Sequence, residues 1–369
     1  MLKKGYYESK GYEIFKQYES YRKRYTSLAS DFQISFLLGL IKYFKFSNGK
    51  NISNVLEIGM DQGVTSLYML LTGFNSSNFK LHTIEIMDSD YYGKALENAN
   101  SHQKKALDMN KGCTIFDIEN ILDDDDLLDL VFIDGGHSHP SPLIDLLYLL
   151  PYLHSESIVC LHDVVDHMRP NAWGESFIFT SWSDDKYRAY DLDNDLKPLN
   201  QNTLGVIKLP SNNNIINKEQ IFRDLIKIAK LPFKAPPWNS KMPDENTLKD
   251  IKFFMEKGKG KDFYDSSFSN EFYNIFLKQV ELYEKDHILL QHETNFFNYL
   301  FNNVRYLLSE NKQMKKNIND NQNLLSLNKQ EFKKLKRESI KNKKELDVIK
   351  DSNSWKLTKP FRKLRTLFK

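Results

Sequence analysis

The sequence predicts an α/β fold with a parallel sheet, followed by a helical region and a coiled coil. Two observations indicate the sheet: residues 54–67 combine a strand, a glycine turn and a helix, and five strand-like runs each end near Gly, Asp, Glu or His. A heptad-like repeat that begins near residue 297 indicates the coiled coil. We therefore expect five segments: a lead-in at 1–30, an α/β domain at 31–210, a helical extension at 217–296, a coiled coil at 297–351 and a basic tail at 352–369.

The composition suits a globular protein with one large core and an extension. Of its 369 residues, 40% are hydrophobic and 27% are charged. The net charge of +3 gives no sign of a nucleic-acid partner. Cys113 and Cys160 lie in apolar runs, which predicts buried thiols and not a disulfide or a metal site. The first residues lack an apolar signal segment and no run reaches about 18 apolar residues, so we expect a cytoplasmic protein.

A strand, a glycine turn and a helix follow one another near residue 60. Residues 54–58 (NVLEI) form a short, mostly apolar run that is typical of a buried strand. Gly59 and Gly63 then bracket a tight turn, and a helix is predicted at 64–71. Glycines let the backbone approach a ligand, and unpaired N–H groups at a helix start bind polar ligand atoms. The arrangement predicts a nucleotide-binding turn.

The turn reads Glu-x-Gly-x-x-x-Gly. It differs from the phosphate-binding Gly-x-Gly-x-x-Gly because Asp61 stands where that pattern has its middle glycine. The turn resembles motif I of the class I S-adenosylmethionine (SAM) methyltransferases. SAM carries no pyrophosphate, and an acid can face its ammonium group. The resemblance implies that the cofactor is bound by Glu57, Gly59, Met60, Asp61 and Gly63.

Two further acidic residues are candidates for cofactor contacts. Residues 79–86 predict a second strand that ends at Glu85, about 20 residues beyond the glycine turn, where a carboxylate can accept hydrogen bonds from ribose hydroxyls. The alternative is a strand-end carboxylate in solvent. Residues 91–109 predict a polar helix and 113–116 a third strand. Asp117 follows that strand, and it either lies near the adenine amino group, as in methyltransferases, or caps the next turn.

The fourth and fifth strands end in acid–histidine motifs. Residues 127–133 (LLDLVFI) predict a buried strand that runs into Asp134-Gly-Gly-His137. A helix is predicted at 143–149, and a fifth strand at 157–161 ends in His162-Asp163. Ligands of an open parallel sheet bind beyond the carboxyl ends of its strands. We therefore expect these groups to meet the glycine turn at one edge.

The remaining elements of this part complete the sheet. A helix at 32–44 precedes the first strand, and strands at 186–192 and 203–209 suit an antiparallel pair that closes the sheet. Residues 210–217 are interpreted as a linker. The segment 164–185 is either a loop over the site that grips substrate or an ordered insertion, and its candidate residues are His167, Arg169, Trp173 and Trp182.

Residues from about 31 to 210 resemble a bacterial branch of the class I SAM methyltransferases. In that branch the fourth strand ends in Ile-Asp-Gly-x-His and the fifth in His-Asp, and here these motifs begin at Ile133 and His162. The resemblance implies a Rossmann-like, seven-stranded SAM methyltransferase domain. Relatives include O-methyltransferases of sugars and natural products. The branch also resembles a cephalosporin-hydroxylase group of different chemistry, so a related hydroxylase-like enzyme is an alternative.

The resemblance implies two versions of the catalytic step, in which a hydroxyl attacks the SAM methyl group. In the first, His137 is the general base, since its reference pKa is near neutral, and Asp134 orients it. In the second, a divalent cation such as Mg²⁺ lowers the pKa of the hydroxyl, with Asp134, Asp163 and the weaker ligand His162 around it. The sequence leaves both versions open.

The carboxyl-terminal third predicts a homo-oligomer. Apolar residues and asparagines recur at alternating spacings of three and four, and asparagine at such seam positions sets register. A helix of this length needs a partner. The predicted seam positions are Phe297, Leu300, Val304, Leu307, Asn311, Met314, Ile318, Asn321, Leu325, Asn328, Phe332, Leu335, Ser339, Asn342, Leu346 and Ile349.

The last residues are basic and amphipathic. Residues 353–369 carry six Lys or Arg residues and no acid, and their apolar side chains fall on one helical face. This pattern suits an anionic membrane surface, with a solvated tail or an acidic partner as the alternatives. Residues 354–362 (SWKLTKPFR) resemble the ending of bacterial surface-polysaccharide enzymes. That resemblance implies a glycan or sugar-nucleotide substrate and a position at the inner membrane face.

A second function of a different class is a membrane-docked scaffold. In that case the SAM-binding domain would be degenerate and the coiled coil would be the functional part. Asp61 at a usual glycine position favours this hypothesis slightly, whereas intact Gly59, Gly63, Glu85 and Asp134 disfavour it. SAM binding distinguishes the two.

Overall fold

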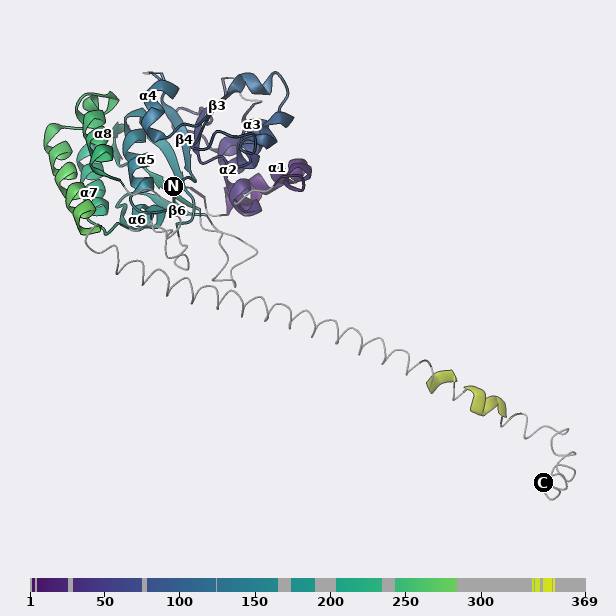
Figure 1. Cartoon of the computed structure of the whole chain (residues 1–369). Helices are drawn as coiled ribbons and strands as arrows, with labels where there is room; N and C mark the ends of the chain where they lie inside the picture. The colour runs from purple at the N-terminus through teal and green to yellow at the C-terminus, as the bar shows by residue number, and fades with distance from the viewer. Residues whose placement is uncertain are drawn as a thin grey trace, which may run out of the picture. The chain divides into compact units, whose positions relative to one another are not determined.

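A computed structural model describes residues 2–3, 5–25, 29–74, 78–123, 125–164, 174–189, 204–233, 243–283, 334, 336–338, 341–346 and 348. The chain divides into two compact units, Met1–Tyr299 and Leu300–Lys369. In the first unit, helices cover both faces of a central sheet (Figure 1). The described residues of the second unit are helical and exposed. Within the described residues, none of the helices combines the length and the apolar character needed to span a membrane.

The sheet has seven strands in the order β3-β2-β1-β4-β5-β7-β6. The first five are parallel, and β7 is antiparallel to both of its neighbours. The predicted fold class and the closing antiparallel strands are therefore confirmed. The strands are β1 (Asn54–Ile58), β2 (Lys80–Glu85), β3 (Leu107–Lys111), β4 (Leu128–Ile133), β5 (Leu153–Leu161), β6 (Lys186–Arg188) and β7 (Gly205–Lys208).

The chain order reverses direction across the sheet between β1 and β4. The strands β1, β2 and β3 run outward to one side, and β4 and β5 run outward to the other. Such a reversal leaves a crevice at the carboxyl ends of the strands, where α/β proteins bind ligands. The candidate residues that follow β1, β4 and β5 are therefore placed at the expected edge.

The two faces of the sheet bury separate apolar cores. Alternate residues of each strand point to opposite faces, so Val55 packs with α1, α2 and α3 while Leu56 packs with α5 and α7. Figure 1 shows the first group of helices on one side of the sheet and α5 to α8 on the other. The helices are α1 (Tyr6–Arg22), α2 (Asp31–Tyr43), α3 (Val64–Gly73), α4 (Ile118–Ile121), α5 (Ser141–Leu149), α6 (Gly174–Ser181), α7 (Lys218–Ala229) and α8 (Glu245–Glu256).

The region between β2 and β4 differs from its prediction. Residues 91–109 form no long helix. They form two 3₁₀ turns, η1 (Lys94–Asn98) and η2 (Gln103–Ala106), and the beginning of β3. The third strand lies before the predicted run at 113–116, which instead leads into the turn η3 (Ile115–Asp117). Because β3 is an edge strand with little burial, its polar sequence (LDMNK) lacks the apolar pattern of a strand, and pairing with β2 decides its structure.

The predicted linker at 210–217 is also structured. Strands β8 (Ser211–Asn212) and β9 (Ile215–Ile216) pair as a short hairpin. Its turn residues Asn213 and Asn214 have φ angles of 51° and 63°, values that asparagine adopts more readily than most residues. The side chain of Asn217 then accepts a hydrogen bond from the Gln220 N–H and so caps α7.

The helical extension shares a core with the sheet domain. Phe254 of α8 stacks on Tyr148 of α5 with ring centroids 4.0 Å apart. The Tyr264 hydroxyl donates a hydrogen bond to the Leu147 carbonyl at 2.6 Å. Phe272 and Phe276, on a helix that the structure describes over residues 266–283, are fully buried in the same core. These contacts stabilise the face of the sheet that carries α5 and α6.

Asp129 fixes the amino-terminal ends of β1, β4 and β5. Its Oδ2 accepts hydrogen bonds from the Ser53 N–H at 2.7 Å and the Asn54 N–H at 2.9 Å. Its Oδ1 lies 3.1 Å from His154 Nε2. Burial alone would raise the pKa of Asp129, but the hydrogen bonds from His154, Asn54 and Ser53 lower it below its ordinary value. The charged carboxylate therefore stabilises the fold above the pKa of the unfolded chain, and this contribution is lost as pH falls through the folded pKa.

We expect Asp129→Ala to lower the free energy of unfolding at pH 7 by about 1–3 kcal/mol, because two partly buried N–H groups lose a charged acceptor. The difference from the parent should shrink in strong acid. Urea unfolding at both pH values measures it. Asp125→Ala, at an exposed loop position before β4, is the matched control and should change little. Equal stabilities of the two variants at pH 7 would contradict this role for Asp129.

Candidate active site

The glycine turn after β1 presses directly against the loop after β4. Gly59 has a φ of +84°, and its N–H donates to the Ile84 carbonyl at 2.9 Å. A Cβ at Gly59 would lie 2.2 Å from the Asp134 carbonyl oxygen. Gly63 has a φ of +77°, and a Cβ there would lie 2.9 Å from Gly93 Cα. Only glycine fits both the backbone conformation and the space at these two positions.

Glu85 holds the glycine turn in place through its carboxylate. Its Oε2 accepts hydrogen bonds from the N–H groups of Met60 and Asp61, each at 3.1 Å, and its Oε1 accepts one from the Met87 N–H at 3.1 Å. The Glu85 side chain is buried. The alternative of a solvated strand-end carboxylate is therefore wrong, and the acid lies against the turn where a cofactor would be bound.

The other acids predicted at the cofactor have different surroundings. Glu57 is fully buried and accepts a hydrogen bond from the Ser66 hydroxyl of α3; burial and the charge of Asp134 raise its pKa well above the ordinary value. It lies beneath the turn and supports α3. Asp61 is half-buried in a left-handed conformation, with a φ of 49°. Burial raises its pKa, against hydrogen bonds that include one with Tyr91.

Asp117 caps its own turn. Its Oδ2 accepts hydrogen bonds from the Thr114 N–H at 2.8 Å and the Thr114 hydroxyl at 3.2 Å. Asp117 therefore closes the turn before it, and its side chain makes no capping hydrogen bond to the next helix, α4. Met60 is buried beside Gly93, next to the turn that it belongs to.

Parallel pairing brings the ends of three strands together. Ile58, Ile133 and Leu161 are paired neighbours across β1, β4 and β5. The residues after them are therefore adjacent as well: the Asp134 N–H donates to the Ile58 carbonyl at 2.8 Å, and the His162 N–H donates to the Ile133 carbonyl at 3.0 Å. This register places the glycine turn, Asp134 and His162 side by side.

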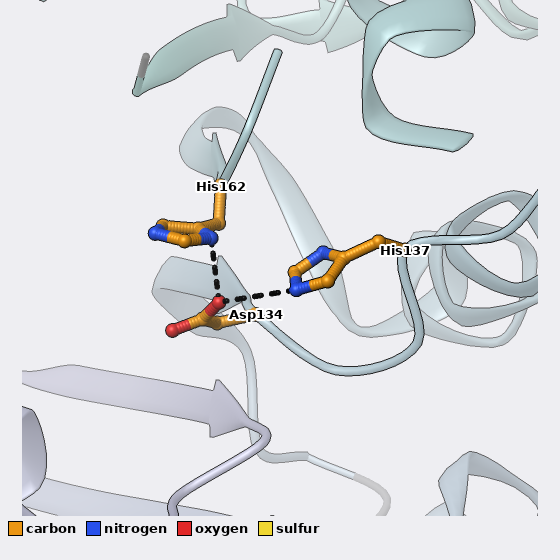
Figure 2. Close-up of side chains that lie close together, drawn as sticks. All are labelled: Asp134, His137 and His162. Atoms are coloured by element: carbon orange, nitrogen blue, oxygen red, sulfur yellow. Dashed lines mark ion pairs between the residues drawn. The ribbon is translucent and has the colours of Figure 1, made fainter. Parts of the chain in front are cut away.

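Asp134, His137 and His162 form a compact cluster at this edge. The three ligand atoms that they offer all lie within 4.8 Å of one another. Asp134 Oδ1 lies 2.8 Å from His162 Nδ1 and 3.9 Å from His137 Nε2, and both rings point at the same carboxylate (Figure 2). Asp163 is not a member of this group, although its Oδ1 lies 3.4 Å from His162 Nδ1. The predicted residues Asp134 and His162 therefore meet, with Asp163 beside His162, and His137 faces the same Asp134 carboxylate.

His137 is oriented by Glu175, a residue that sequence analysis missed. His137 Nδ1 lies 2.7 Å from Glu175 Oε1, and the carboxylate belongs to the amino-terminal turn of α6 and is fully buried. The Gly174 N–H also donates to the His137 carbonyl at 2.9 Å. A single acid in the otherwise uncharged run GESFIFTS is a signal that could have identified Glu175.

The carboxylates of the cluster favour protonated histidines. Burial alone would lower the pKa of His137, but the charge and hydrogen bond of Glu175 and the charges of Asp134 and Asp163 raise it to about 10. Burial alone would also lower the pKa of His162, but the negative charge of Asp134 raises it above its ordinary value. The near-neutral pKa that would make His137 a ready base is therefore not found in these surroundings.

The predicted substrate loop is only partly described. Trp182 is buried, and its indole N–H donates to the Lys208 carbonyl at 2.8 Å, so it packs beside β7 instead of gripping substrate. The other candidates of the loop, His167, Arg169 and Trp173, lie outside the described residues.

The close approach of the two loops predicts that Gly59 tolerates no side chain. Gly59→Ala should destabilise the protein by clearly more than Gly49→Ala. Gly49 has a similar φ of +79° but no atom within 4 Å of its Cβ position, so only the left-handed backbone penalty, about 1–2 kcal/mol, applies there. Urea unfolding compares the two free energies. Equal losses would mean that the contact with Asp134 places no constraint on the turn.

Comparison with known proteins finds a family model that matches the part of the chain that carries these strand ends. A family model described as a methyltransferase domain matches residues 56–164, which run from β1 to just beyond the His162-Asp163 pair. This match bears out the methyltransferase class that the sequence predicts for this part of the chain. No curated protein matches the chain.

Solved structures similar to the chain include O-methyltransferases. TomG from Streptomyces achromogenes, involved in tomaymycin synthesis and in complex with SAM, is 16% identical with a TM-score of 0.37, over 57% of this chain and 92% of TomG. An O-methyltransferase from Bacillus cereus, in complex with SAH, is 16% identical with a TM-score of 0.33, over 53% and 88% of the two chains. Cofactor-bound Rv0187 from MTB is 12% identical with a TM-score of 0.41, over 54% and 91%. At such low identities these proteins say nothing about the acceptor of this chain.

Proposed function

We propose that this chain is a SAM-dependent O-methyltransferase that methylates a sugar hydroxyl. One observation carries the proposal. The glycine turn that Glu85 fixes and the Asp134–His137–His162 cluster adjoin each other at one sheet edge, with the Gly59 Cβ position only 2.2 Å from the Asp134 carbonyl oxygen. A methyl donor on the turn and an acceptor at the cluster would therefore be neighbours, as in-line transfer requires.

The residues around the turn suit SAM. Glu85 is the acceptor for the ribose hydroxyls, and the amino-terminal end of α3, which begins at Val64, adds unpaired N–H groups. Asp61 lies half-exposed on the turn and supplies the negative charge for the ammonium group of SAM. Asp117 stays a weaker candidate for the adenine, since its Oδ2 already accepts two hydrogen bonds.

The cluster can orient the acceptor hydroxyl and take up its proton. An acceptor hydroxyl is a poor nucleophile, and its proton must leave as its oxygen forms a bond to the methyl carbon and the carbon–sulfur bond breaks. The Asp134 carboxylate, whose side chain is 14% exposed, orients the hydroxyl. His137 can take up the proton only after it has lost its own second proton, because its pKa is about 10. We assign the catalytic step to Asp134 and His137 together.

Magnesium does not fit the donor atoms of the cluster. Mg²⁺ takes oxygen ligands in octahedral geometry and keeps several waters. The atoms that come together here are two imidazole nitrogens and one carboxylate oxygen, and Asp163 lies outside that group. No catalytic step is therefore assigned to Mg²⁺ held by Asp134, Asp163 and His162.

The sugar acceptor is supported by the tail sequence alone. Residues 354–362, which lie outside the described residues, resemble the ending of surface-polysaccharide enzymes. A glycan or sugar nucleotide is the acceptor class that this pattern favours, and a place at the inner membrane face would suit such a substrate. A panel of sugar nucleotides tests it.

SAM affinity should depend on Glu85. We expect Glu85→Ala to weaken SAM binding by roughly 5–150-fold, because ribose hydroxyls and the N–H groups of the turn lose their acceptor. Calorimetric titration measures the affinity. Glu97→Ala, on the exposed side of η1, is the control and should bind SAM like the parent. Absence of SAM binding by the parent itself would leave the scaffold hypothesis in its place.

Methyl transfer should collapse in Asp134→Asn and His137→Ala while SAM still binds. Loss of acid–base assistance lowers rates by about 10²–10⁴-fold. Transfer of a labelled methyl group to the sugar-nucleotide panel, beside SAM titration of each variant, separates chemistry from cofactor binding. Transfer at parental rates in either variant would remove that residue from the catalytic step.

We also propose that the second unit self-associates and docks on an anionic membrane. Leu346, a predicted seam position, lies in a described helical stretch and is 47% exposed, so it is accessible to a partner helix. The basic tail would supply roughly 1 kcal/mol of membrane attraction for each Lys or Arg near the surface.

Truncation after Tyr299 tests this proposal. The full chain should sediment as an oligomer and pellet with anionic vesicles, whereas residues 1–299 should stay monomeric, remain unpelleted and bind SAM. A full chain that is monomeric and does not pellet would refute both the assembly and the membrane contact.

A further inference from the structure

We propose that Asn98 and Tyr25 are positioning residues of the cofactor site. They hold the segment 91–98 against the glycine turn and thereby keep Asp61 in place for the ammonium group of SAM. The part played by the ammonium group rests on the proposed SAM-dependent function. The hold on the turn does not, because it follows from contacts within the chain.

Asp61 is the residue of the turn that needs support. It stands where the phosphate-binding pattern has a glycine, and its φ of 49° lies in the left-handed region that L side chains rarely adopt. Its backbone is held on both sides: the Asp61 N–H donates to Glu85 Oε2 at 3.1 Å, and its carbonyl accepts from the Gly93 N–H at 2.8 Å. The second of these bonds comes from the segment 91–98.

The segment 91–98 also contacts the rest of the turn. The Ala95 N–H donates to the Gln62 carbonyl at 2.8 Å. A Cβ at Gly63 would lie 2.9 Å from Gly93 Cα and 3.2 Å from Leu96 Cγ, so the two stretches of backbone are in close contact. Ala95 and Leu96 are buried. A displacement of this segment would therefore displace the turn.

Asn98 fixes the end of the segment through both hydrogens of its side-chain amide. Its Nδ2 donates to the Ala95 carbonyl at 2.8 Å and to the Tyr25 hydroxyl at 2.8 Å. The first bond closes the 3₁₀ turn η1, whose Ala95 contacts the glycine turn. The second joins η1 to a residue 73 positions earlier in the chain. Asn98 thus links the cofactor turn to the amino-terminal part of the protein.

Tyr25 has a fixed support, because it follows α1 and α1 packs on α3. The Tyr68 hydroxyl of α3 donates to the Tyr18 carbonyl of α1 at 2.7 Å. Phe15 of α1 stacks on the Tyr68 ring with centroids 5.2 Å apart. Since α3 begins directly after Gly63, the amino-terminal part contacts the helix that follows the turn and, through Tyr25, the segment that packs on the turn.

Calorimetric titration of the full-length protein with SAM tests the two residues. Asn98→Ala should weaken SAM binding by roughly 2–10-fold, as expected for the loss of about one net hydrogen bond, and Tyr25→Phe should weaken it by no more than that. Glu97→Ala, at the exposed neighbour on η1, and Tyr12→Phe, at an exposed position of α1, are the controls and should bind like the parent. Parental affinity in both Asn98→Ala and Tyr25→Phe would overturn the proposal.

Double variants distinguish positioning from a general loss of stability. Asp61→Asn removes the charge but keeps a residue that tolerates the left-handed conformation. Asn98→Ala should therefore weaken SAM binding clearly less in the Asp61→Asn background than in the parent, because both changes act on the same contact. Asn98→Ala with Tyr25→Phe should bind SAM as Asn98→Ala alone does. Fully additive losses in both double variants would contradict the positioning role.

Amide hydrogen exchange of the SAM-free protein separates this proposal from the proposed function. Asn98→Ala and Tyr25→Phe should speed exchange at the Gly93 and Ala95 N–H groups and leave the amides of β1 as in the parent. Faster exchange in a protein that does not bind SAM would refute the methyltransferase function and support the hold on the turn. SAM binding by the parent, with unchanged exchange in both variants, would refute the hold on the turn alone.

Discussion

The parallel pairing of β1, β4 and β5 is the constraint on which the site depends. Because Ile58, Ile133 and Leu161 are paired neighbours, the three chain segments leave the sheet at the same level. The glycine turn then has to pass within van der Waals distance of the Asp134 carbonyl, and only a glycine at 59 permits that approach. A one-residue slip in either pairing would turn every side chain to the opposite face and separate the acid from the histidines.

The edge that results is rich in buried charge, which opposes folding unless the charges are paired. Glu175, Asp134 and Asp163 surround His137 and raise its pKa to about 10 against the effect of burial, so a protonated His137 balances part of this negative charge. Asp61 and Asp163 also adopt left-handed backbone conformations, with φ angles of 49° and 51°. Backbone strain and shifted pKa values both cluster at functional sites, and here they occur together at the same strand ends.

The helical extension supports this edge through α6. The Ser183 hydroxyl, just beyond α6, donates to Asp224 of α7 at 2.7 Å, and the Ser183 N–H donates to the same carboxylate at 3.1 Å. The His139 ring packs between Phe177 of α6 and Phe233, which follows α7. Since Glu175 lies at the start of α6, the extension helps to fix the carboxylate that orients His137.

The sequence by itself determined the strands β1, β2, β4 and β5, the glycine turn and the acids and histidines at their ends, because apolar runs and glycines act through local conformation and burial. Tertiary structure alone decided the edge strand β3, whose polar residues are ordered by pairing with β2. It also decided that Asp117 accepts hydrogen bonds from Thr114 and that Glu57 accepts one from Ser66 of α3. The pairing of His137 with Glu175 joins residues 38 positions apart, and the meeting of His137 with Asp134 and His162 depends on how the loops pack. Such contacts arise from packing between distant segments, which no local pattern encodes.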